Sequence, residues 1–324
     1  MKKPMKVILA LLIVVVLAVV ATGAYYSYAL PNVGPAPQLS VDVNAATIER
    51  GKYLVNNVAA CMVCHTRRDF TFFGGPVDSS LFGAGGERFD RSMVPGILYT
   101  TNITPFALQG WTDGEIYRAI TMGVKKDGSA IYPVMPYLRY GKMDTTDVYA
   151  MIAYLRSLKP VERETPPKGK LDFPLNFTVN TYPQKPSPVN RPDTANTIEY
   201  GKYLVNVANC EQCHSKTNKA DIIPGTEFGG GQGYFLRTGA AYSGNLTPDP
   251  ETGIGKWTKE YFISRFKQYA SATYTPFKPE GQAFNSPMPW LSFANMKESD
   301  LAAIYDYLRT VKPIKNKVVK WVPE

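Results

Sequence analysis

Two copies of one short motif organise this chain, "CMVCH" at residues 61–65 and "CEQCH" at residues 210–214. Each copy has two cysteines separated by two residues and a histidine directly after the second cysteine. Together the copies contain all four cysteines of the 324-residue chain and its only two histidines, His65 and His214. The reactive side chains of the sequence are therefore concentrated at two places.

The sequence around the motifs is an internal repeat. "TIERGKYLVNNVAACMVCH" (47–65) matches "TIEYGKYLVNVANCEQCH" (197–214), which is one residue shorter. Further pairs follow in the same order in both halves: "NITP" (102–105) and "NLTP" (245–248), "GWTDGE" (110–115) and "KWTKEY" (256–261), "YPVMPY" (132–137) and "NSPMPW" (285–290), "DVYAMIAYLRSLKPV" (147–161) and "DLAAIYDYLRTVKPI" (300–314). A duplicated domain of ordinary size explains this order.

Helical periodicity marks the end of each repeat. Apolar residues recur at i, i+3, i+4 and i+7, which predicts one buried face per helix. They are Val148, Met151, Ile152, Leu155 and Leu158 in the first repeat and Leu301, Ile304, Tyr305, Leu308 and Val311 in the second. Asn196 and Glu199 have capping-box spacing before the second motif. Because no alternating apolar run is long enough for a substantial sheet, we expect an all-α fold with two tandem domains.

The same patterns predict the organisation of the chain. We expect a membrane anchor or signal peptide at 1–30, a spacer at 31–46, domains at 47–162 and 195–314, a Pro-rich linker at 163–194 and a tail at 315–324. Eight prolines between residues 160 and 192 favour an extended linker that lies against the domains.

The N-terminal segment is basic at its start and then apolar. Three lysines precede a run without charge up to Asp42, and about 20 apolar residues span a bilayer core. Tyr25, Tyr26 and Tyr28 have the place of an interfacial aromatic belt, which favours an uncleaved transmembrane helix. The "ATGA" stretch leaves a cleaved signal peptide open. Either interpretation keeps the lysines in the cytoplasm and puts the domains on the periplasmic side of the cytoplasmic membrane.

The net charge of +9 does not indicate a nucleic-acid-binding protein. Residues 47–162 contain 13 basic and 11 acidic side chains, and residues 195–314 contain 12 and 11. The excess lies in the membrane flank, the linker and the tail. Without a basic stripe, a solvated surface is the better interpretation.

Metal binding and disulfides are the alternatives for a CxxC pair. A zinc ribbon gathers its ligands within one small unit, whereas a whole repeat separates these pairs. A thioredoxin-like pair sits at a strand-to-helix turn in an α/β pattern, which is absent here. Structural disulfides suit an exported chain but leave both histidines unexplained.

Covalent haem attachment accounts for every part of the motif. Two thiols can add to the haem vinyl groups as thioethers, and two intervening residues on a helical turn match the spacing of those groups. The adjacent histidine then lies beneath the iron as its proximal ligand. We therefore expect two c-type haems, attached at Cys61 and Cys64 and at Cys210 and Cys213, with His65 and His214 as iron ligands.

The second iron ligand must be another residue type, because no third histidine exists. Methionine is the usual partner in high-potential electron transfer. Met135 and Met288 occupy matching positions beside prolines, which hold the chain in an extended loop. Other methionines in the repeats compete for the role: Met93, Met122, Met143, Met151 and Met296.

Two further pairs of matching residues have structural or haem-related interpretations. Trp111 and Trp257 could pack on haem or donate a hydrogen bond to a haem propionate. The alternative is that both are ordinary aromatic core residues. Gly51 and Gly201 could allow the first and last helices of each repeat to cross closely, since glycine otherwise costs about 1 kcal/mol in a helix. The expected facing residues are Tyr154, Leu155, Tyr307 and Leu308.

The sequence resembles class I cytochrome c and, more narrowly, the cytochrome c subunits of membrane-bound alcohol and gluconate dehydrogenases. The segments that carry the resemblance are "GKYLV", "NLTPDPETGIGKWT", "YPVMPY", "AYLRSLKPV" and the linker's "LDFPLNF". It implies that the four cysteines carry haem and that His65, His214, Met135 and Met288 bind iron. The chain departs from those subunits in having two haem motifs where three are common, no "DPETGIG" in the first repeat, and an N-terminal anchor.

Electron transfer without substrate chemistry is the function we expect, because His/Met ligation leaves no open position on iron. The donor would be a dehydrogenase or a quinol-oxidising complex of a respiratory chain, and the acceptor a terminal oxidase or a soluble cytochrome. The alternative is a dihaem redox enzyme of the peroxidase or thiosulfate-oxidising type. Such an enzyme needs a displaceable or cysteine iron ligand, and the chain has no fifth cysteine.

Overall fold

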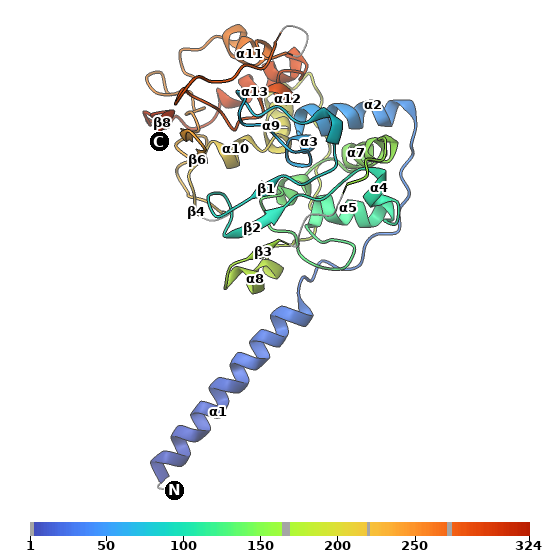
Figure 1. The fold of residues 1–324 in the computed structure, drawn as a ribbon, viewed down its shortest axis with the longest axis vertical. Helices are drawn as coiled ribbons and strands as arrows, with labels where there is room; N and C mark the ends of the chain where they lie inside the picture. The colour runs from blue at the N-terminus through green and yellow to red at the C-terminus, as the bar shows by residue number, and fades with distance from the viewer. Residues whose placement is uncertain (1–2, 164–168, 219–220, 271–273) are drawn as a thin grey trace.

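A long helix, α1 (Lys3–Ala24), projects from a rounded body formed by the rest of the chain (Figure 1). The computed structural model describes residues 3–163, 169–218, 221–270 and 274–324. α1 continues into a π-helical turn, η1 (Tyr25–Ala29), and neither element contains a buried residue. The combined helix Lys3–Ala29 has a mean hydropathy of 3.1 in its most apolar window, so its length and composition suffice to cross a membrane.

The two repeats form their helices in the same order. The first repeat contains α2 (Ala45–Tyr53), η2 (Leu54–Val58), α3 (Cys61–Cys64), η3 (Ser79–Leu81), α4 (Pro105–Leu108), α5 (Asp113–Met122), α6 (Tyr137–Tyr140) and α7 (Thr145–Ser157). The second contains α9 (Thr197–Val207), α10 (Cys210–Cys213), α11 (Lys259–Lys267), α12 (Trp290–Phe293) and α13 (Glu298–Leu308). The internal repeat of the sequence is thus also a repeat of helices.

A π-helical turn absorbs the one-residue difference between the two copies. α2 runs directly into η2, whereas α9 is α-helical throughout. A single π-turn accommodates one inserted residue within a helix. In each repeat, one residue in the left-handed conformation then precedes the cysteine motif. It is Ala60 with φ 50° in the first repeat and Asn209 with φ 55° in the second. Both motifs therefore leave the preceding helix in the same way.

The first and last helices of each repeat cross at a glycine, as the sequence predicts. A Cβ atom on Gly51 of α2 would lie 1.9 Å from the carbonyl oxygen of Ala150 on α7. A Cβ atom on Gly201 of α9 would lie 1.9 Å from the carbonyl oxygen of Ala303 on α13. The atoms nearest to the glycines belong mainly to these alanine backbones. Of the four side chains expected to face the glycines, only Tyr154 is among the nearest neighbours, at Gly51.

The repeats contact each other through a reciprocal pair of hydrogen bonds. Tyr53 on α2 donates to Asp300 Oδ2 at 2.6 Å, and the equivalent Tyr203 on α9 donates to Asp147 Oδ2 at 2.7 Å. Both aspartates lie in the first turn of the last helix of their repeat and are buried. Because each repeat presents the same surface to the other, the interface resembles that of a two-fold symmetric dimer. One continuous apolar core, the main core, runs through both halves.

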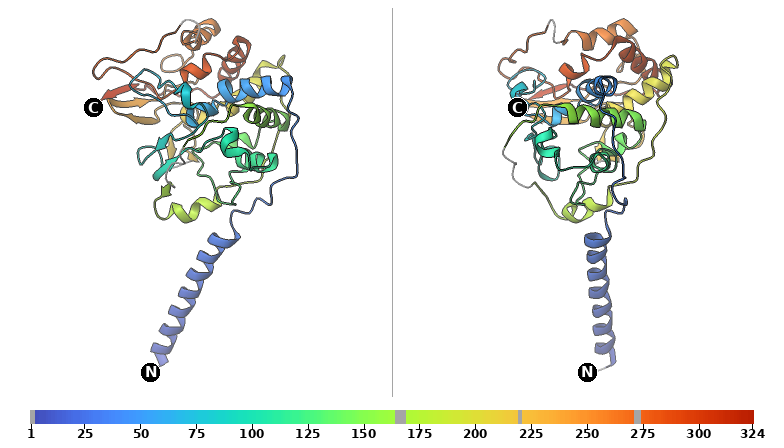
Figure 2. Two further views of the ribbon diagram at one scale, coloured as in Figure 1. Left: turned by 45° about the vertical axis from the view of Figure 1, so that its right-hand side comes forward. Right: turned by 90° about the vertical axis from the view of Figure 1, so that its right-hand side faces the viewer.

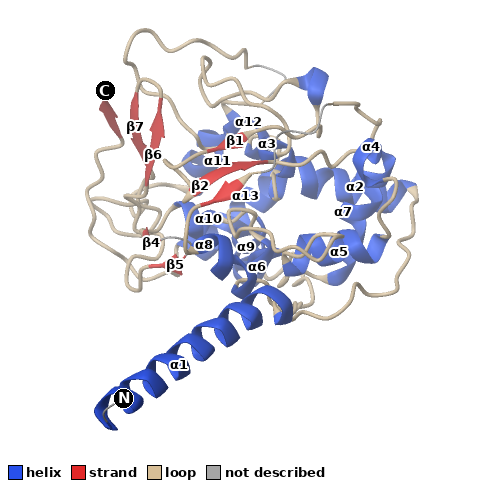
Figure 3. Cartoon of the chain, turned by 60° about the horizontal axis from the view of Figure 1, so that its bottom comes forward, coloured by secondary structure: helices blue, strands red, loops and turns tan. Residues whose placement is uncertain are grey.

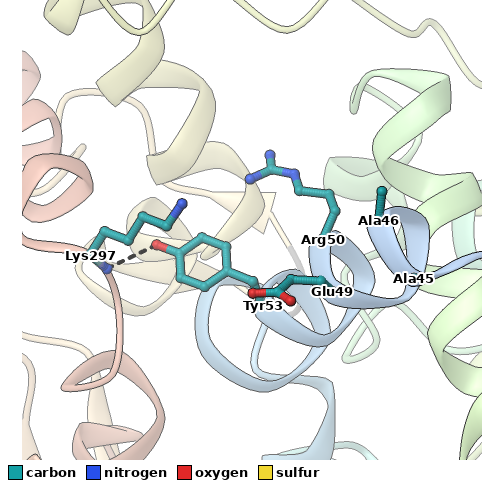
Figure 4. A pocket seen from close by; sticks show the side chains of 6 residues that line it. All are labelled: Ala45, Ala46, Glu49, Arg50, Tyr53 and Lys297. Atoms are coloured by element: carbon teal, nitrogen blue, oxygen red, sulfur yellow. Dashed lines mark hydrogen bonds between the residues drawn. The ribbon is translucent and has the colours of Figure 1, made fainter.

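Beside this interface the surface forms a hollow of about 530 Å³. Its lining residues are Ala45, Ala46, Glu49, Arg50, Tyr53 and Lys297 (Figure 4). The backbone nitrogen of Lys297 donates to the Tyr53 hydroxyl at 3.0 Å, so this hydroxyl accepts one bond and donates another. Arg50 pairs with Asp147 at 2.8 Å. The hollow contains no residue of the cysteine motifs and is part of the interface between the repeats.

Small sheets accompany the helices in the described residues (Figure 3). All are antiparallel: β1 (Arg88–Phe89) with β2 (Gly96–Tyr99) and β3 (Lys170–Leu171), β4 (Thr217–Asn218) with β5 (Asp221–Ile222), and β6 (Gly233–Leu236) with β7 (Gly239–Tyr242) and β8 (Trp321–Pro323). The fold is therefore mainly helical, and the expectation of an all-α chain overlooked these pairings, which strands of two to four residues do not reveal by periodicity.

The linker lies against the body as expected but has structure of its own. It contributes β3, α8 (Leu175–Thr178) and a 3₁₀ turn, η4 (Val179–Thr181). Leu171 and Leu175 join a second, smaller core with Phe89, Val94 and Tyr132. This part of the linker lies at the end of the body from which α1 projects (Figure 2). Residues 164–168 of the predicted linker fall outside the described residues.

Candidate haem sites

Each cysteine motif is one helical turn. The backbone nitrogens of His65 and His214 donate to the carbonyls of Cys61 and Cys210 at 2.9 Å, which closes the turn. The four cysteines are free thiols in the structure. The thiols and the imidazole of each motif are thereby presented within a single turn, as the sequence predicts.

The second thiol of each motif is the more exposed of the two. Cys64 and Cys213 are exposed, yet desolvation by the surrounding protein raises the pKa of both thiols, that of Cys64 to about 11. An exposed group can lose solvation in this way where the chain surrounds it without covering it. Burial also raises the pKa of Cys61 and Cys210, each to about 12. Solvent thus reaches the second thiol of each motif, as attachment of a group from outside the chain requires.

Each histidine is oriented by a backbone carbonyl. Nδ1 of His65 lies 2.8 Å from the carbonyl oxygen of Thr101, and Nδ1 of His214 lies 2.8 Å from that of Gly244. Thr101 and Gly244 are equivalent in the repeat, each directly before the Asn-x-Thr-Pro segment. With Nδ1 as the donor, Nε2 is free to bind iron. Burial lowers the pKa of both histidines, which keeps the imidazoles neutral as ligation requires.

The Asn-x-Thr-Pro segments hold those carbonyls in place, a role that the sequence comparison of the repeats did not assign. In the first repeat Asn102 Nδ2 donates to the Val161 carbonyl at 2.8 Å, and Asn102 Oδ1 accepts from the Thr104 backbone and hydroxyl at 2.8 Å. In the second repeat Asn245 makes the same bonds to Ile314 and Thr247 at 2.7 to 2.9 Å. The recurrence of Asn and Thr at fixed spacing was the available signal.

A glycine in each repeat lets a second loop approach the backbone of the histidine closely. The nitrogens of Gly85 and Gly230 donate to the carbonyls of His65 and His214 at 2.7 Å. Both glycines have positive φ, 70° and 73°, and a Cβ atom there would lie within 2.6 Å of the chain that carries the histidine's carbonyl partner. Only glycine fits both conditions.

Met135 and Met288 differ from the competing methionines in exposure. Both are partly buried and pack at the edge of the main core. Met143, Met151 and Met296 are 1% exposed within that core, Met122 is 8% exposed, and Met93 is 49% exposed. The carbonyls of Met135 and Met288 accept from Tyr137 and Trp290 at 2.8 Å, so the two loops turn alike.

The matching tryptophans and the tyrosine after Met135 differ in burial. Trp111 and Trp257 are partly buried against the main core, where both interpretations place them. Tyr137, two residues after Met135, is fully buried, and its hydroxyl has no hydrogen-bond partner among the described residues. Burial raises the pKa of this hydroxyl, so it stays protonated and able to donate.

Two arginines, one from each repeat, connect the cysteine motif of one repeat with the methionine segment of the other. Arg68, three residues after His65, donates to the carbonyl of Pro287, directly before Met288, from both terminal nitrogens at 3.2 Å. Arg139, four residues after Met135, pairs with Glu211 of the second motif at 2.8 Å. The charge of Cys213 also contributes to the raised pKa of Cys64, so the two motifs lie within electrostatic reach of each other.

The known proteins that this chain matches include cytochrome c subunits, the class of protein that its motifs resemble. Residues 198–312 match the cytochrome c family. The chain is 28% identical over 296 residues to the fructose dehydrogenase cytochrome subunit of Gluconobacter japonicus, covering 86% of this chain and 55% of that protein. It is 27% identical over 296 residues to the alcohol dehydrogenase (quinone) cytochrome c subunit of Gluconacetobacter polyoxogenes, covering 87% and 59%. It is 30% identical over 167 residues to a diheme cytochrome c-type protein of Cereibacter sphaeroides, covering 49% and 54%. The chain thus spans only about half to three fifths of the length of these relatives.

Proposed function

We propose that this chain, which carries a cytochrome c domain and is related to cytochrome c subunits of dehydrogenases, is a membrane-anchored electron-transfer protein with two c-type haems. The observation that carries the proposal is the equivalence of the two sites. Each has two free thiols and a histidine on one turn, with the histidine Nδ1 held by a carbonyl from the same position of its repeat. One site matches the cytochrome c family, and the other has the same parts.

A haem bound at such a site supplies one-electron chemistry. The chain's own residues would attach and orient it. Thioethers from the cysteines fix its position, and the bond from the histidine Nδ1 to its carbonyl fixes the ring and raises the basicity of Nε2. The asparagines of the Asn-x-Thr-Pro segments hold that carbonyl.

Methionine ligation of both irons is supported by exposure and by sequence position. An iron ligand lies where the core meets the bound group, and Met135 and Met288 are partly buried at the edge of the main core. The fully buried competitors would have to leave well-packed positions, at a cost of about 2–5 kcal/mol for a methionine side chain lost from a core. With histidine and methionine on each iron, neither site would have a vacant position for substrate.

The names of the relatives support a dehydrogenase as the partner of this protein. We propose that it receives electrons from a dehydrogenase on the periplasmic side of the membrane and passes them from one haem to the other and onward. Purification from native membranes tests this. A dehydrogenase should co-purify in constant ratio, and its substrate should reduce both haems. A preparation without such a partner, whose unmutated form binds carbon monoxide at one haem, would favour the peroxidase-type alternative.

Arg68 should tune the second haem, although it follows the first motif. Arg68→Gln removes a positive charge and the bonds that hold the Met288 loop, so the potential of the second haem should fall by on the order of tens of millivolts. Arg67→Gln is the matched control, because Arg67 is exposed and carries the same charge one residue away. Spectroelectrochemical titration measures both variants. Equal shifts in the two variants would mean that the contact to Pro287 has no special role.

A further inference from the structure

The structured part of the linker contacts the membrane end of the chain. α8 and η4 lie beside η1, the π-helical turn at the end of the apolar helix (Figures 1 and 2). Asn180 Nδ2 donates to the carbonyl of Tyr26 at 3.0 Å. If α1 spans a bilayer, η1 emerges at its surface, and α8 lies at the same level. We call residues 170–182 the linker foot.

The linker foot exposes aromatic side chains at this level. Phe173 is 82% exposed and Phe177 is 46% exposed, and their ring centroids lie 6.3 Å apart in an edge-to-face contact. Leu175 between them is buried. On the adjoining η1, Tyr28 is 91% exposed. A phenylalanine this exposed, beside a second one and a tyrosine, forms an apolar patch that water solvates poorly.

The linker foot is fastened to the body on its other side. β3 pairs with β2, and Leu171 and Leu175 pack in the second core. Asp172 accepts two bonds from Arg91, at 2.7 and 2.9 Å. The foot therefore moves with the body, and whatever it contacts also holds the body.

We propose that Phe173 and Phe177 insert into the lipid headgroup region and give the body a second contact with the membrane beside α1. The proposal rests on the proposed membrane anchor. Aromatic side chains favour this interface, where one side is apolar and the other wet. The argument for lipid as the occupant is continuity, because the patch adjoins the last turn of the membrane helix and bonds to it. Two contacts would fix the tilt of the body and hence the height of each haem site above the bilayer.

Spin labels on the full chain in phospholipid nanodiscs test this. Phe173→Cys carries the label under test, and Val15→Cys places a label in the middle of α1. Phe235→Cys is the control, because it places a label on β6 at a position where the native phenylalanine is 62% exposed. Each measurement is referenced to the same labelled chain under nitrogen, so that any constant relaxation by haem iron cancels. The unmutated chain, treated with the same reagent, shows that the native cysteines stay unlabelled. Power saturation compares relaxation by oxygen, which enters lipid, with relaxation by a nickel chelate, which stays in water.

We expect labels at 15 and 173 to respond to oxygen several-fold more than to the chelate, and the label at 235 to show the reverse. A label at 15 in lipid with a label at 173 in water would overturn the linker foot while the anchor stands. A label at 15 in water would overturn both. A label at 173 shielded from both reagents would show a protein contact in place of lipid. Haem spectra, recorded separately, report on the proposed electron-transfer function.

Discussion

Leucine in place of Met288 is expected to lower the potential of the second haem by on the order of 0.1 V, within the ~0.8 V range that axial ligands span. The thioether favours the ferrous state, and leucine offers no donor atom. The variant's ferric haem should lose the weak long-wavelength sulfur-to-iron charge-transfer band, and its ferrous haem should bind carbon monoxide. The fold should survive, because this exchange keeps size and apolarity and costs less than about 1.5 kcal/mol.

Met296→Leu is the matched control. Met296 lies in the same repeat but is 1% exposed within the main core. Its replacement should leave spectrum and potential unchanged. Met135→Leu should act on the first haem as Met288→Leu does on the second. If Met288→Leu keeps its full charge-transfer signal while Met296→Leu loses it, the assignment of the two methionines is reversed.

Alanine at Gly201 is expected to be the most destabilising single-atom addition in the second repeat. The new methyl group would lie 1.9 Å from the Ala303 carbonyl oxygen and 2.5 Å from its carbon, so α9 and α13 would have to separate. Overpacking against backbone should cost about 3 kcal/mol or more and lower Tm by roughly 10 °C. Thermal unfolding followed by circular dichroism measures this.

Gly110→Ala is the control for that substitution. The nearest atom to a Cβ at Gly110 is the flexible Lys126 Nζ at 3.8 Å, and the residue does not have positive φ. Gly51→Ala should behave as Gly201→Ala does, because its Cβ would also lie 1.9 Å from a carbonyl. Similar Tm values for Gly201→Ala and Gly110→Ala would contradict the close crossing.

Local pattern and repetition predicted much of the helical framework. The apolar spacing located α7 and α13, and the recurring glycines located the two helix crossings. The capping signal at Asn196 was half right. Its side chain accepts from the Glu199 backbone at 3.3 Å, whereas full reciprocal boxes form between Asn44 and Thr47 and between Thr112 and Glu115. The apolar faces and caps depend on residues close in sequence, and the glycine crossings were indicated because the same glycine recurs in both repeats.

Apart from the two helix crossings, the contacts between distant segments were not predicted. β7 pairs with β8 near the end of the chain, and neither strand is long enough to show alternation. The bonds from Tyr53 to Asp300 and from Tyr203 to Asp147 join different repeats, and nothing in either local sequence indicates the exchange. The role of Asn102 likewise depends on Val161, the last residue of a matched segment. The residues were conspicuous in the repeat, but their partners required the fold.

Counting the haems bound to the exported chain tests the central claim most directly. Whole-protein mass spectrometry after acid–acetone extraction, which removes haem that is not covalently attached, should show the mass of the chain plus two haems. Cys210→Ser combined with Cys213→Ser should reduce the count to one and leave the haem of the first motif in place. A chain that emerges without covalent haem, or with masses that fit only disulfides or zinc at the two CxxCH motifs, would contradict the account.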